Sequence, residues 1–272
     1  MQVRPTHFRI RLAASLLIAT LFVFPLWVVL VTSLDDPAGL GFGAWPIPSN
    51  LRFENYVEAW QATNFPRQFV NSLVVALAVT AGQVLTSLMA GYAFARIRFI
   101  GRDVILMALL STIIVPFQVL VIPVFVILAK LSWINTYWAL IVPSLANAFG
   151  IFLFAQFFRT IPFELEEAAY VDGATRWRVL WQIMVPLARP AIATLFLFTF
   201  IAEWNELFKP LVFTSTTDMR TVQLGLSVFQ EQFRVDYAHL MAAVVFTTVP
   251  SVLLFLLGQK HFVKGIATTG LK

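Results

Sequence analysis

The chain has 272 residues, of which 59% are hydrophobic and only 12% are charged. Soluble domains carry about 25% charged residues, so most of these side chains face something other than water. The net charge of +5 is spread between apolar runs, which argues against nucleic-acid binding, and the absence of cysteine excludes disulfides, thiolate metal sites and cysteine nucleophiles.

Six apolar runs are long enough to cross a membrane, because about 20 helical residues span the hydrocarbon core. They cover residues 12–32, 70–95, 104–129, 137–158, 187–213 and 239–260. We therefore expect an all-α, polytopic membrane protein of about six transmembrane helices, forming a single transmembrane domain over residues 1–272. The first run is longer than the apolar region of a signal peptide and no A-x-A cleavage site follows it, so we expect it to be retained.

The distribution of basic residues predicts the orientation of these helices. If the N-terminus lies in the cytoplasm, most of the 19 Lys and Arg residues fall in cytoplasmic segments. The positive-inside rule then places both termini in the cytoplasm and segments 33–69 and 214–238 outside. His7, His239 and His261 each lie near the end of a predicted span, and nothing gathers them into a metal site.

Two of the predicted helices carry special residues. Pro116 and Pro123 interrupt the third run, where they indicate either a simple kink or a helix that bends during gating. In the second run, small residues recur every four positions and predict a tight helix–helix seam. They are Ala78, Gly82, Thr86 and Ala90.

Polar residues in the membrane are the next candidates for function. Glu203, Glu206 and Lys209 are spaced by three in the fifth run, which predicts that they lie near one helix face. Charges at membrane depth usually face a bundle interior or a cavity, so this cluster either lines a pore or gate or is an internally paired cluster. Pore candidates of the same kind, with packing hydrogen bonds as the alternative, are Asn205, Gln118 and Asn147.

The segment between the fourth and fifth runs, about residues 160–186, predicts two short helices. Pro162 and the acidic residues Glu164, Glu166 and Glu167 are typical of a helix start, and Gly173 is typical of a helix end. A second helix over about 175–184 would place four apolar residues on one face at the membrane interface. These are Trp177, Leu180, Trp181 and Met184.

This segment resembles the EAA motif of bacterial ATP-binding-cassette (ABC) importer permeases. The motif reads EAA-x3-G-x9-I-x-L-P, and the chain has Glu167-Ala168-Ala169, Gly173, Ile183 and Val185-Pro186 at that spacing, with valine in place of leucine. Further stretches resemble the carbohydrate-uptake permeases of the maltose-transporter type, and within them the smaller, six-helix subunit. These stretches are Phe69–Leu73, Gly91–Arg96, Asn135-Thr136, Asp172–Ala174, Trp204–Glu206 and Lys264–Gly270.

The resemblance implies a transport subunit of the bacterial cytoplasmic (inner) membrane, not an enzyme. It implies partners: a second homologous permease subunit, a dimer of ABC ATPases and an extracytoplasmic substrate-binding protein. ATP and Mg would be bound by the ATPase subunits, and no cofactor by this chain, which has no G-x-x-x-x-G-K-[ST] motif. The segment would be the coupling helix that docks into the ATPase, through Glu167, Ala168, Ala169, Asp172, Gly173 and Ala174.

The transported substrate would be a sugar or polyol, and a polyol, a disaccharide and a glycerol phosphate diester all fit. Two other functions stay open from the residues alone. An ion-driven secondary transporter would usually show repeats and interrupted helices in matching halves, and no repeat is seen here. A membrane-embedded hydrolase could use Glu203 and Glu206 as paired carboxylates, although no nucleophile motif, metal site or histidine partner accompanies them.

Overall fold

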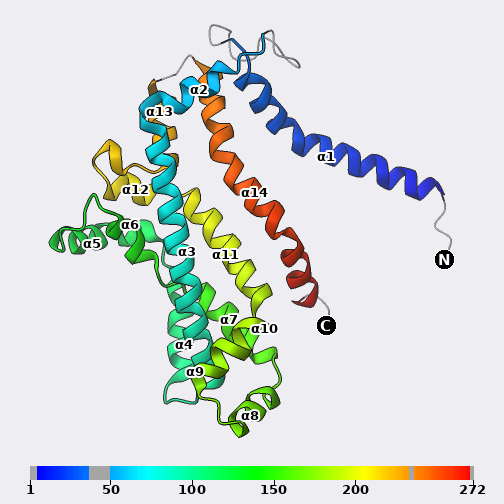
Figure 1. Cartoon of the computed structure of the whole chain (residues 1–272), viewed down its shortest axis with the longest axis vertical. Coiled ribbons are helices and arrows are strands. Elements are labelled where there is room, and N and C mark those ends of the chain that lie inside the picture. Colours follow the sequence, from blue (N-terminus) through cyan, green and yellow to red (C-terminus); the bar gives the residue numbers. More distant parts are fainter. Residues whose placement is uncertain (1–4, 37–49, 233–235, 270–272) are drawn as a thin grey trace. The chain divides into compact units, whose positions relative to one another are not determined.

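The computed structural model describes residues 5–36, 50–232 and 236–269, without the side chains of 5–10, 63, 230–232 and 260–269. Parts of the two expected outer segments, 37–49 and 233–235, therefore lie outside the described residues, as do the side chains of the Lys264–Gly270 stretch. The described residues form α-helices, short 3₁₀ turns and one π-helical segment, with no strand among them (Figure 1). The predicted all-α class is confirmed.

The described residues divide into two compact units. The first unit comprises residues from 1–67 and 224–250, and the second comprises residues from 68–223 and 251–272. The helices α3 and α14 supply residues to both. In the first unit the helices are α1 (Pro5–Ser33), α2 (Glu54–Gln61), η1 (Ala62–Asn64), most of α13 (Val222–Gln232) and the first part of α14 (Tyr237–Thr269).

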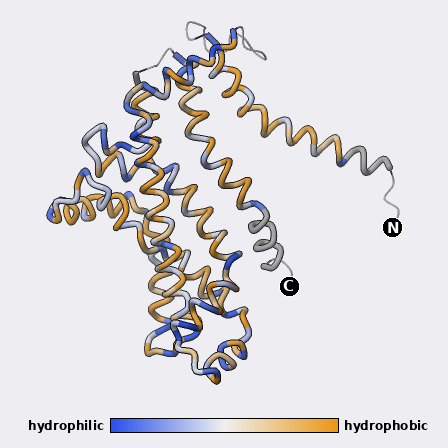
Figure 2. The backbone as a smooth tube through the Cα atoms, viewed as in Figure 1, coloured by the Kyte–Doolittle hydropathy of each residue, from blue (hydrophilic) through white to orange (hydrophobic). Residues whose placement is uncertain are grey.

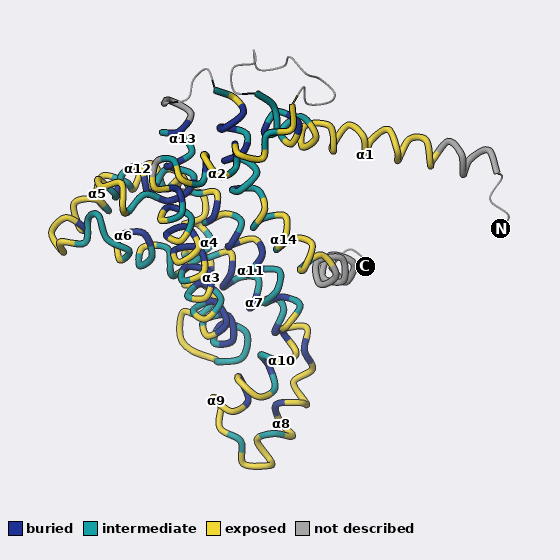
Figure 3. Tube along the Cα trace, turned by 45° about the horizontal axis from the view of Figure 1, so that its top comes forward, coloured by how far each residue is buried: buried dark blue, intermediate teal, exposed yellow. Residues whose placement is uncertain are grey.

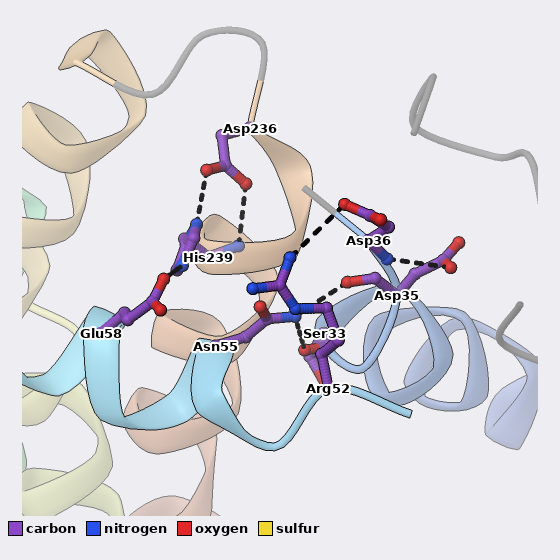
Figure 4. Close-up of polar contacts among 8 residues, drawn as sticks. All are labelled: Ser33, Asp35, Asp36, Arg52, Asn55, Glu58, Asp236 and His239. Carbon is purple, nitrogen blue, oxygen red and sulfur yellow. Dashed lines mark hydrogen bonds and ion pairs between the residues drawn. The ribbon is translucent and has the colours of Figure 1, made fainter. Parts of the chain in front are cut away.

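Helix α1 is apolar and exposed along most of its length from residue 11 onward (Figure 3). An apolar helix that the chain itself leaves uncovered is expected in a bilayer, where lipid replaces the protein core as its surroundings. Its end is held by polar contacts to α2 (Figure 4). The side-chain amide of the buried Asn55 donates through Nδ2 to the backbone oxygens of Ser33, at 3.0 Å, and Asp35, at 2.8 Å.

The start of α14 is also tied to α2 within this unit. His239 lies between two carboxylates, with Nδ1 against Asp236 and Nε2 at 2.6 Å from Glu58 Oε2 (Figure 4). The described residues hold no group of three or more His, Asp or Glu side chains that could bind a metal ion. His239 links the start of α14 to Glu58 of α2 through these contacts.

The second unit contains the remaining elements, in chain order. They are α3 (Phe65–Arg96), α4 (Arg102–Ser111), η2 (Thr112–Ile114), α5 (Phe117–Lys130), α6 (Tyr137–Ile141), η3 (Val142–Ser144), α7 (Ala148–Thr160), α8 (Glu164–Val171), α9 (Arg176–Val179), the π-helical η4 (Leu180–Met184), α10 (Val185–Leu187), α11 (Arg189–Trp204), α12 (Phe208–Phe213) and η5 (Thr217–Met219).

Among the described residues, three helices are long and apolar enough to cross a membrane, and six spans result if each of three bent helix pairs counts as one. The apolar colour runs along α1, α3, α11 and α14 in Figure 2. The third expected span is not one straight helix, because the chain turns by 101° between α4–η2 and α5. Pro116 stands at this break as the N-cap of α5, whereas Pro123 is accommodated inside α5.

Helix α3 packs closely against α7 and the turn before it. A Cβ added at Gly91 would lie 2.5 Å from Phe154 Cβ and 3.0 Å from the Ala155 backbone nitrogen. The row of small residues predicted as a seam meets the turn before α7, where a Cβ at Gly82 would lie 2.3 Å from Leu145 Cδ2. Small residues therefore permit this approach, as the spacing predicts.

Candidate functional site

The segment 160–186 folds as a short helix, a tight turn and a second helix at one end of the second unit (Figure 1). Helix α8 begins at Glu164, two residues after Pro162, and has Glu164, Glu166 and Glu167 in its first turn. Acidic residues there complement the helix dipole. The start that the sequence predicts is thus confirmed to within two residues.

The end of α8 is a Schellman turn around Gly173. The Gly173 amide donates to the Tyr170 oxygen at 3.0 Å and the Ala174 amide to the Ala169 oxygen at 2.9 Å. Gly173 has φ +79°, which L side chains rarely adopt, and a Cβ added there would meet no atom within 4 Å. Glycine is therefore required by the backbone conformation and not by crowding within this chain.

The second helix starts at Arg176, with Thr175 Oγ1 accepting from the Arg178 amide at 3.4 Å. Its four apolar residues do not share one face, contrary to prediction. Leu180 and Met184 are buried in the core, whereas Trp177 and Trp181 are exposed. The reason is the π-helical segment Leu180–Met184, which precedes Pro186 and shifts the register of the helix face.

A buried ion pair fixes α8 to the end of α3. Glu166 is fully buried, and its Oε1 lies 2.5 Å from Arg96 Nε. The same carboxylate accepts from Tyr92 Oη at 3.1 Å, and Arg96 donates to the Ile161 oxygen at 2.6 Å. The loop is thereby joined to the last residue of a 32-residue apolar helix.

The residues expected to dock on a partner divide into two groups. Glu167, Ala168, Asp172 and Gly173 are exposed, whereas Ala169 and Ala174 are partly buried against the core of the second unit. Glu166 and Arg96 were missed as a pair by the sequence reasoning. Glu166 precedes Glu167 by one residue and so points about 100° away from it around the helix, but nothing in the sequence pairs it with Arg96.

A second polar network lies at the turn before α7 and on α11. The buried Gln83 side chain donates to the Ser144 oxygen at 2.7 Å, and its Oε1 accepts from Asn147 Nδ2 at 3.1 Å and Thr199 Oγ1 at 3.2 Å. Asn147 also caps α7 by accepting from the Phe149 amide at 2.8 Å. These bonds hold α3, α7 and α11 together through polar side chains.

Lys209 extends this network through an ion pair. Its Nζ lies 2.8 Å from both carboxylate oxygens of Glu203 and 2.8 Å from Ser144 Oγ. The side chains of Glu203 and Lys209 are each only 10% exposed. Charges of opposite sign are therefore paired where water is scarce.

The prediction that Glu203, Glu206 and Lys209 lie on one continuous helix is wrong. Helix α11 ends at Trp204 and α12 begins at Phe208, so the expected fifth run 187–213 is broken. Glu206 Oε1 instead accepts from the amides of Phe208, at 2.7 Å, and Lys209, at 3.2 Å, and so caps α12. Pro210 in the first turn of α12 is consistent with this new helix start.

The other two pore candidates lie outside the network. Asn205 is exposed and bonds to the Ile201 oxygen and to Gln223. Gln118 is exposed on α5. A pocket of about 310 Å³ adjoins the network, lined by Gln83, Asn147, Phe149, Leu195, Phe198, Thr199, Ala202 and Glu203.

Two asparagines from the recognised stretches hold the chain after α12. Asn71 donates to the oxygens of Asp218 and Arg220 and accepts from Tyr137 Oη. Asn135, at φ +63°, accepts from the Ser215 and Thr216 amides. Through these hydrogen bonds, Asn71 and Asn135 hold residues 214–220 in place.

The chain is similar to known transport permeases over most of its length. The family model of the binding-protein-dependent transport system inner membrane component matches residues 82–268. The sn-glycerol-3-phosphate transport system permease protein UgpE of Yersinia pestis bv. Antiqua (strain Antiqua) is 34% identical, with 90% of this chain and 91% of UgpE covered. The trehalose/maltose transport system permease protein MalG of Thermococcus litoralis (strain ATCC 51850 / DSM 5473 / JCM 8560 / NS-C) is 36% identical, with 95% and 94% covered.

A solved structure shares the fold. It is a bacterial ABC transporter involved in the import of the acidic polysaccharide alginate, with a TM-score of 0.82 and 22% identity, and the match covers 96% of this chain and 99% of that one. The residues left three functions open: an importer permease subunit, an ion-driven secondary transporter and a membrane-embedded hydrolase. These similarities select the importer permease subunit. The chain belongs to the family of inner-membrane permease components of binding-protein-dependent transport systems.

Proposed function

We propose that this permease forms half of the translocation pathway for a sugar or polyol. Relatives named for sn-glycerol-3-phosphate and for trehalose or maltose support a polyhydroxylated substrate. A substrate-binding protein delivers the substrate from outside, and a second permease subunit completes the pathway. The two compact units act as one transmembrane domain with both termini in the cytoplasm, in accordance with the charge distribution.

In this proposal the segment 160–186 couples the permease to a separate ATPase dimer that binds ATP and Mg. The observation that carries it is the opposite surroundings of two adjacent glutamates. Glu166 is buried and paired with Arg96, whereas Glu167 is exposed and forms no ion pair among the described residues. One glutamate thus fastens α8 to α3, and its neighbour is free to face a basic group of the ATPase.

The exposed part of α8 suits a close contact. Ala168 and Gly173 are small and exposed, and the exposed Asp172 lies between them in the chain, directly after the last residue of α8. A rigid helix that enters a groove transmits displacement through packing, and the Schellman turn makes its end rigid. Movement of α8 would reach α3 through the Glu166–Arg96 pair, which gives coupling a physical path.

The pocket of about 310 Å³ is the proposed wall of the translocation pathway. Asn147, Thr199 and Glu203 supply hydrogen-bonding groups, and Phe149 and Phe198 supply exposed aromatic faces. Polar groups beside aromatic rings suit a molecule with hydroxyl groups and apolar C–H faces. Asn205, Glu206 and Gln118, the other pore candidates, are proposed here only as neighbours of the pathway.

Affinity purification from mild detergent, with mass spectrometry of the recovered proteins, tests the assembly. We expect a P-loop ATPase and a second multi-span permease to be recovered with this chain. Recovery of this chain alone, from a detergent in which a related importer complex stays intact, would contradict the proposed partners.

A further inference from the structure

An arginine-lined pocket of about 590 Å³ lies between the end of α3, the start of α4 and the start of α9, all within the second unit. Its arginines are Arg96, Arg98, Arg102 and Arg176, and Ala95 and Phe163 complete the lining. A neighbouring pocket of about 440 Å³ shares Arg98 and Arg102. Three separate elements thus bring guanidinium groups to one hollow.

The charges in this pocket are not balanced by the chain itself. Arg96 is neutralised by the buried Glu166 at 2.5 Å. Arg102 pairs with Asp103 at 3.0 Å, but that carboxylate is 72% exposed, and such surface pairs contribute little. Arg98 and Arg176 are exposed and form no ion pair with any described residue. The pocket therefore offers two uncompensated positive charges to an anion.

The surroundings place this pocket at a membrane boundary. Arg96 is the last residue of α3, which is long and apolar enough to cross a bilayer. Helix α4, which begins at the pocket, has exposed apolar side chains at Val104, Ile105 and Met107. Guanidinium groups beside an exposed apolar helix match the two parts of a phospholipid, because arginine binds phosphate oxygens in pairs and acyl chains cover apolar side chains.

We propose that Arg98 and Arg176, assisted by Arg102, bind the phosphate group of an anionic phospholipid headgroup, whose acyl chain lies along α4. A soluble phosphate would offer the same group to the arginines. The exposed apolar residues of α4 favour the lipid, since a soluble anion has no apolar part that could cover them. This site is separate from the translocation pathway and does not depend on the identity of the transported substrate.

Native mass spectrometry of the purified permease with its partner subunits measures how many lipid molecules the complex binds. The detergent-solubilised complex is titrated with phosphatidylglycerol and, separately, with phosphatidylcholine. We expect the Arg98→Gln/Arg176→Gln variant to bind phosphatidylglycerol about 25-fold more weakly than the unmodified protein, since each basic side chain near an anionic surface contributes about a fivefold factor. Phosphatidylcholine should bind weakly to both.

The matched control is Arg159→Gln/Arg178→Gln, which removes two exposed arginines that do not line the pocket. It should bind phosphatidylglycerol like the unmodified protein. Arg98→Lys/Arg176→Lys keeps the charge but loses the paired phosphate contacts, so it should regain part of the binding, which separates loss of the site from misfolding. Equal binding by all variants, or equal binding of the two lipids, would overturn the proposal. Displacement of the lipid by equimolar inorganic phosphate would overturn the lipid source.

Discussion

Glu166 and Glu167 are neighbours in the chain with opposite surroundings, and this contrast makes a sharp test at the scale of single residues. Replacing Glu166 by Gln leaves Arg96 buried without its counter-charge, and breaking a buried pair costs about 3–5 kcal/mol. We expect a clear fall in thermal stability for Glu166→Gln. For Glu167→Lys we expect unchanged stability of the isolated permease and weaker capture of the ATPase.

Thermal unfolding of the purified permease and pull-down of the ATPase measure these two effects. A double replacement that exchanges the charges, Glu166→Arg with Arg96→Glu, should recover part of the lost stability. Should Glu167→Lys destabilise the isolated permease as much as Glu166→Gln does, the assignment of a buried and an exposed role would be wrong.

Gly173 permits a second test, because Gly101 provides a control with nearly the same backbone. The two glycines have φ +79° and +80°, and neither has an atom within 3.4 Å of an added Cβ. Leucine at either position should therefore cost a similar backbone strain of about 1–2 kcal/mol. Only Gly173→Leu places a side chain on the proposed docking surface, so it alone should abolish ATP-dependent uptake.

Uptake into vesicles, compared at equal amounts of inserted protein, is the appropriate measurement. If Gly101→Leu and Gly173→Leu lose uptake equally, strain and not docking explains the requirement for glycine at 173. Full uptake by Gly173→Leu would remove this turn from the coupling surface.

The role of a residue could be predicted from the sequence where it depends on local conformation, but not where it depends on a distant partner. The motif spacing identified Gly173, whose role is set by its own φ angle and two neighbouring hydrogen bonds. It could not identify Glu166, since the partner Arg96 lies in a distant part of the chain and the burial arises only from tertiary packing. Local conformations are encoded nearby in the sequence, whereas buried pairs are not.

At the scale of elements, the break between α11 and α12 is the main departure from prediction. The apolar run 187–213 has the composition of one helix, yet the helix ends at Trp204. Two signals could have revealed the break: Pro210, which suits the first turn of a new helix, and Glu206, which can cap one. A hydropathy average over the run includes Pro210 and Glu206 without distinguishing them, so it does not reveal the break.

The Glu203–Lys209 pair bridges this break and predicts non-additive effects of mutation. Lys209→Met alone leaves Glu203 unpaired in a site where each side chain is only 10% exposed. We expect each of Lys209→Met and Glu203→Gln to lower stability more than the double variant does, because the double variant buries no uncompensated charge. Thermal unfolding of the four proteins in the same detergent gives the coupling energy.

Uptake assays on the same proteins separate structure from transport. If the Glu203–Lys209 pair serves only to stabilise the break between α11 and α12, the double variant should transport substrate nearly normally. Additive losses in the thermal measurements would instead show that the two charges do not interact, contrary to the 2.8 Å distances.

At the scale of the whole molecule, the all-α class was predicted correctly, and the first, second and sixth apolar runs are single helices long enough to cross a bilayer, whereas the other three runs are bent helix pairs. The prolines predicted a bend in the third run, but neither its size nor the bends in the fourth and fifth runs were predicted, since hydropathy reports composition and not direction. The 101° turn before α5 changes no residue's polarity, and only Pro116 hints at it. The pairing of helices likewise depends on close contacts such as that between Gly91 and Phe154.

The orientation of the whole chain is the remaining large-scale property, and its sequence makes it directly measurable. Because there is no cysteine, any single cysteine introduced is the only thiol to react with a maleimide. Glu164, at the start of α8, and Thr217, in η5, are both exposed. The positive-inside distribution predicts that Glu164→Cys faces the cytoplasm and Thr217→Cys faces outward.

In intact cells, a membrane-impermeant maleimide should therefore label Thr217→Cys and leave Glu164→Cys unlabelled, while inverted vesicles should give the reverse. Both variants should label fully in detergent, which controls for accessibility. The opposite pattern would place the segment 160–186 on the outer side, where no ATP-driven partner could reach it, and would contradict the coupling role together with the topology. Agreement would put the loop where ATP is available, which the coupling mechanism requires.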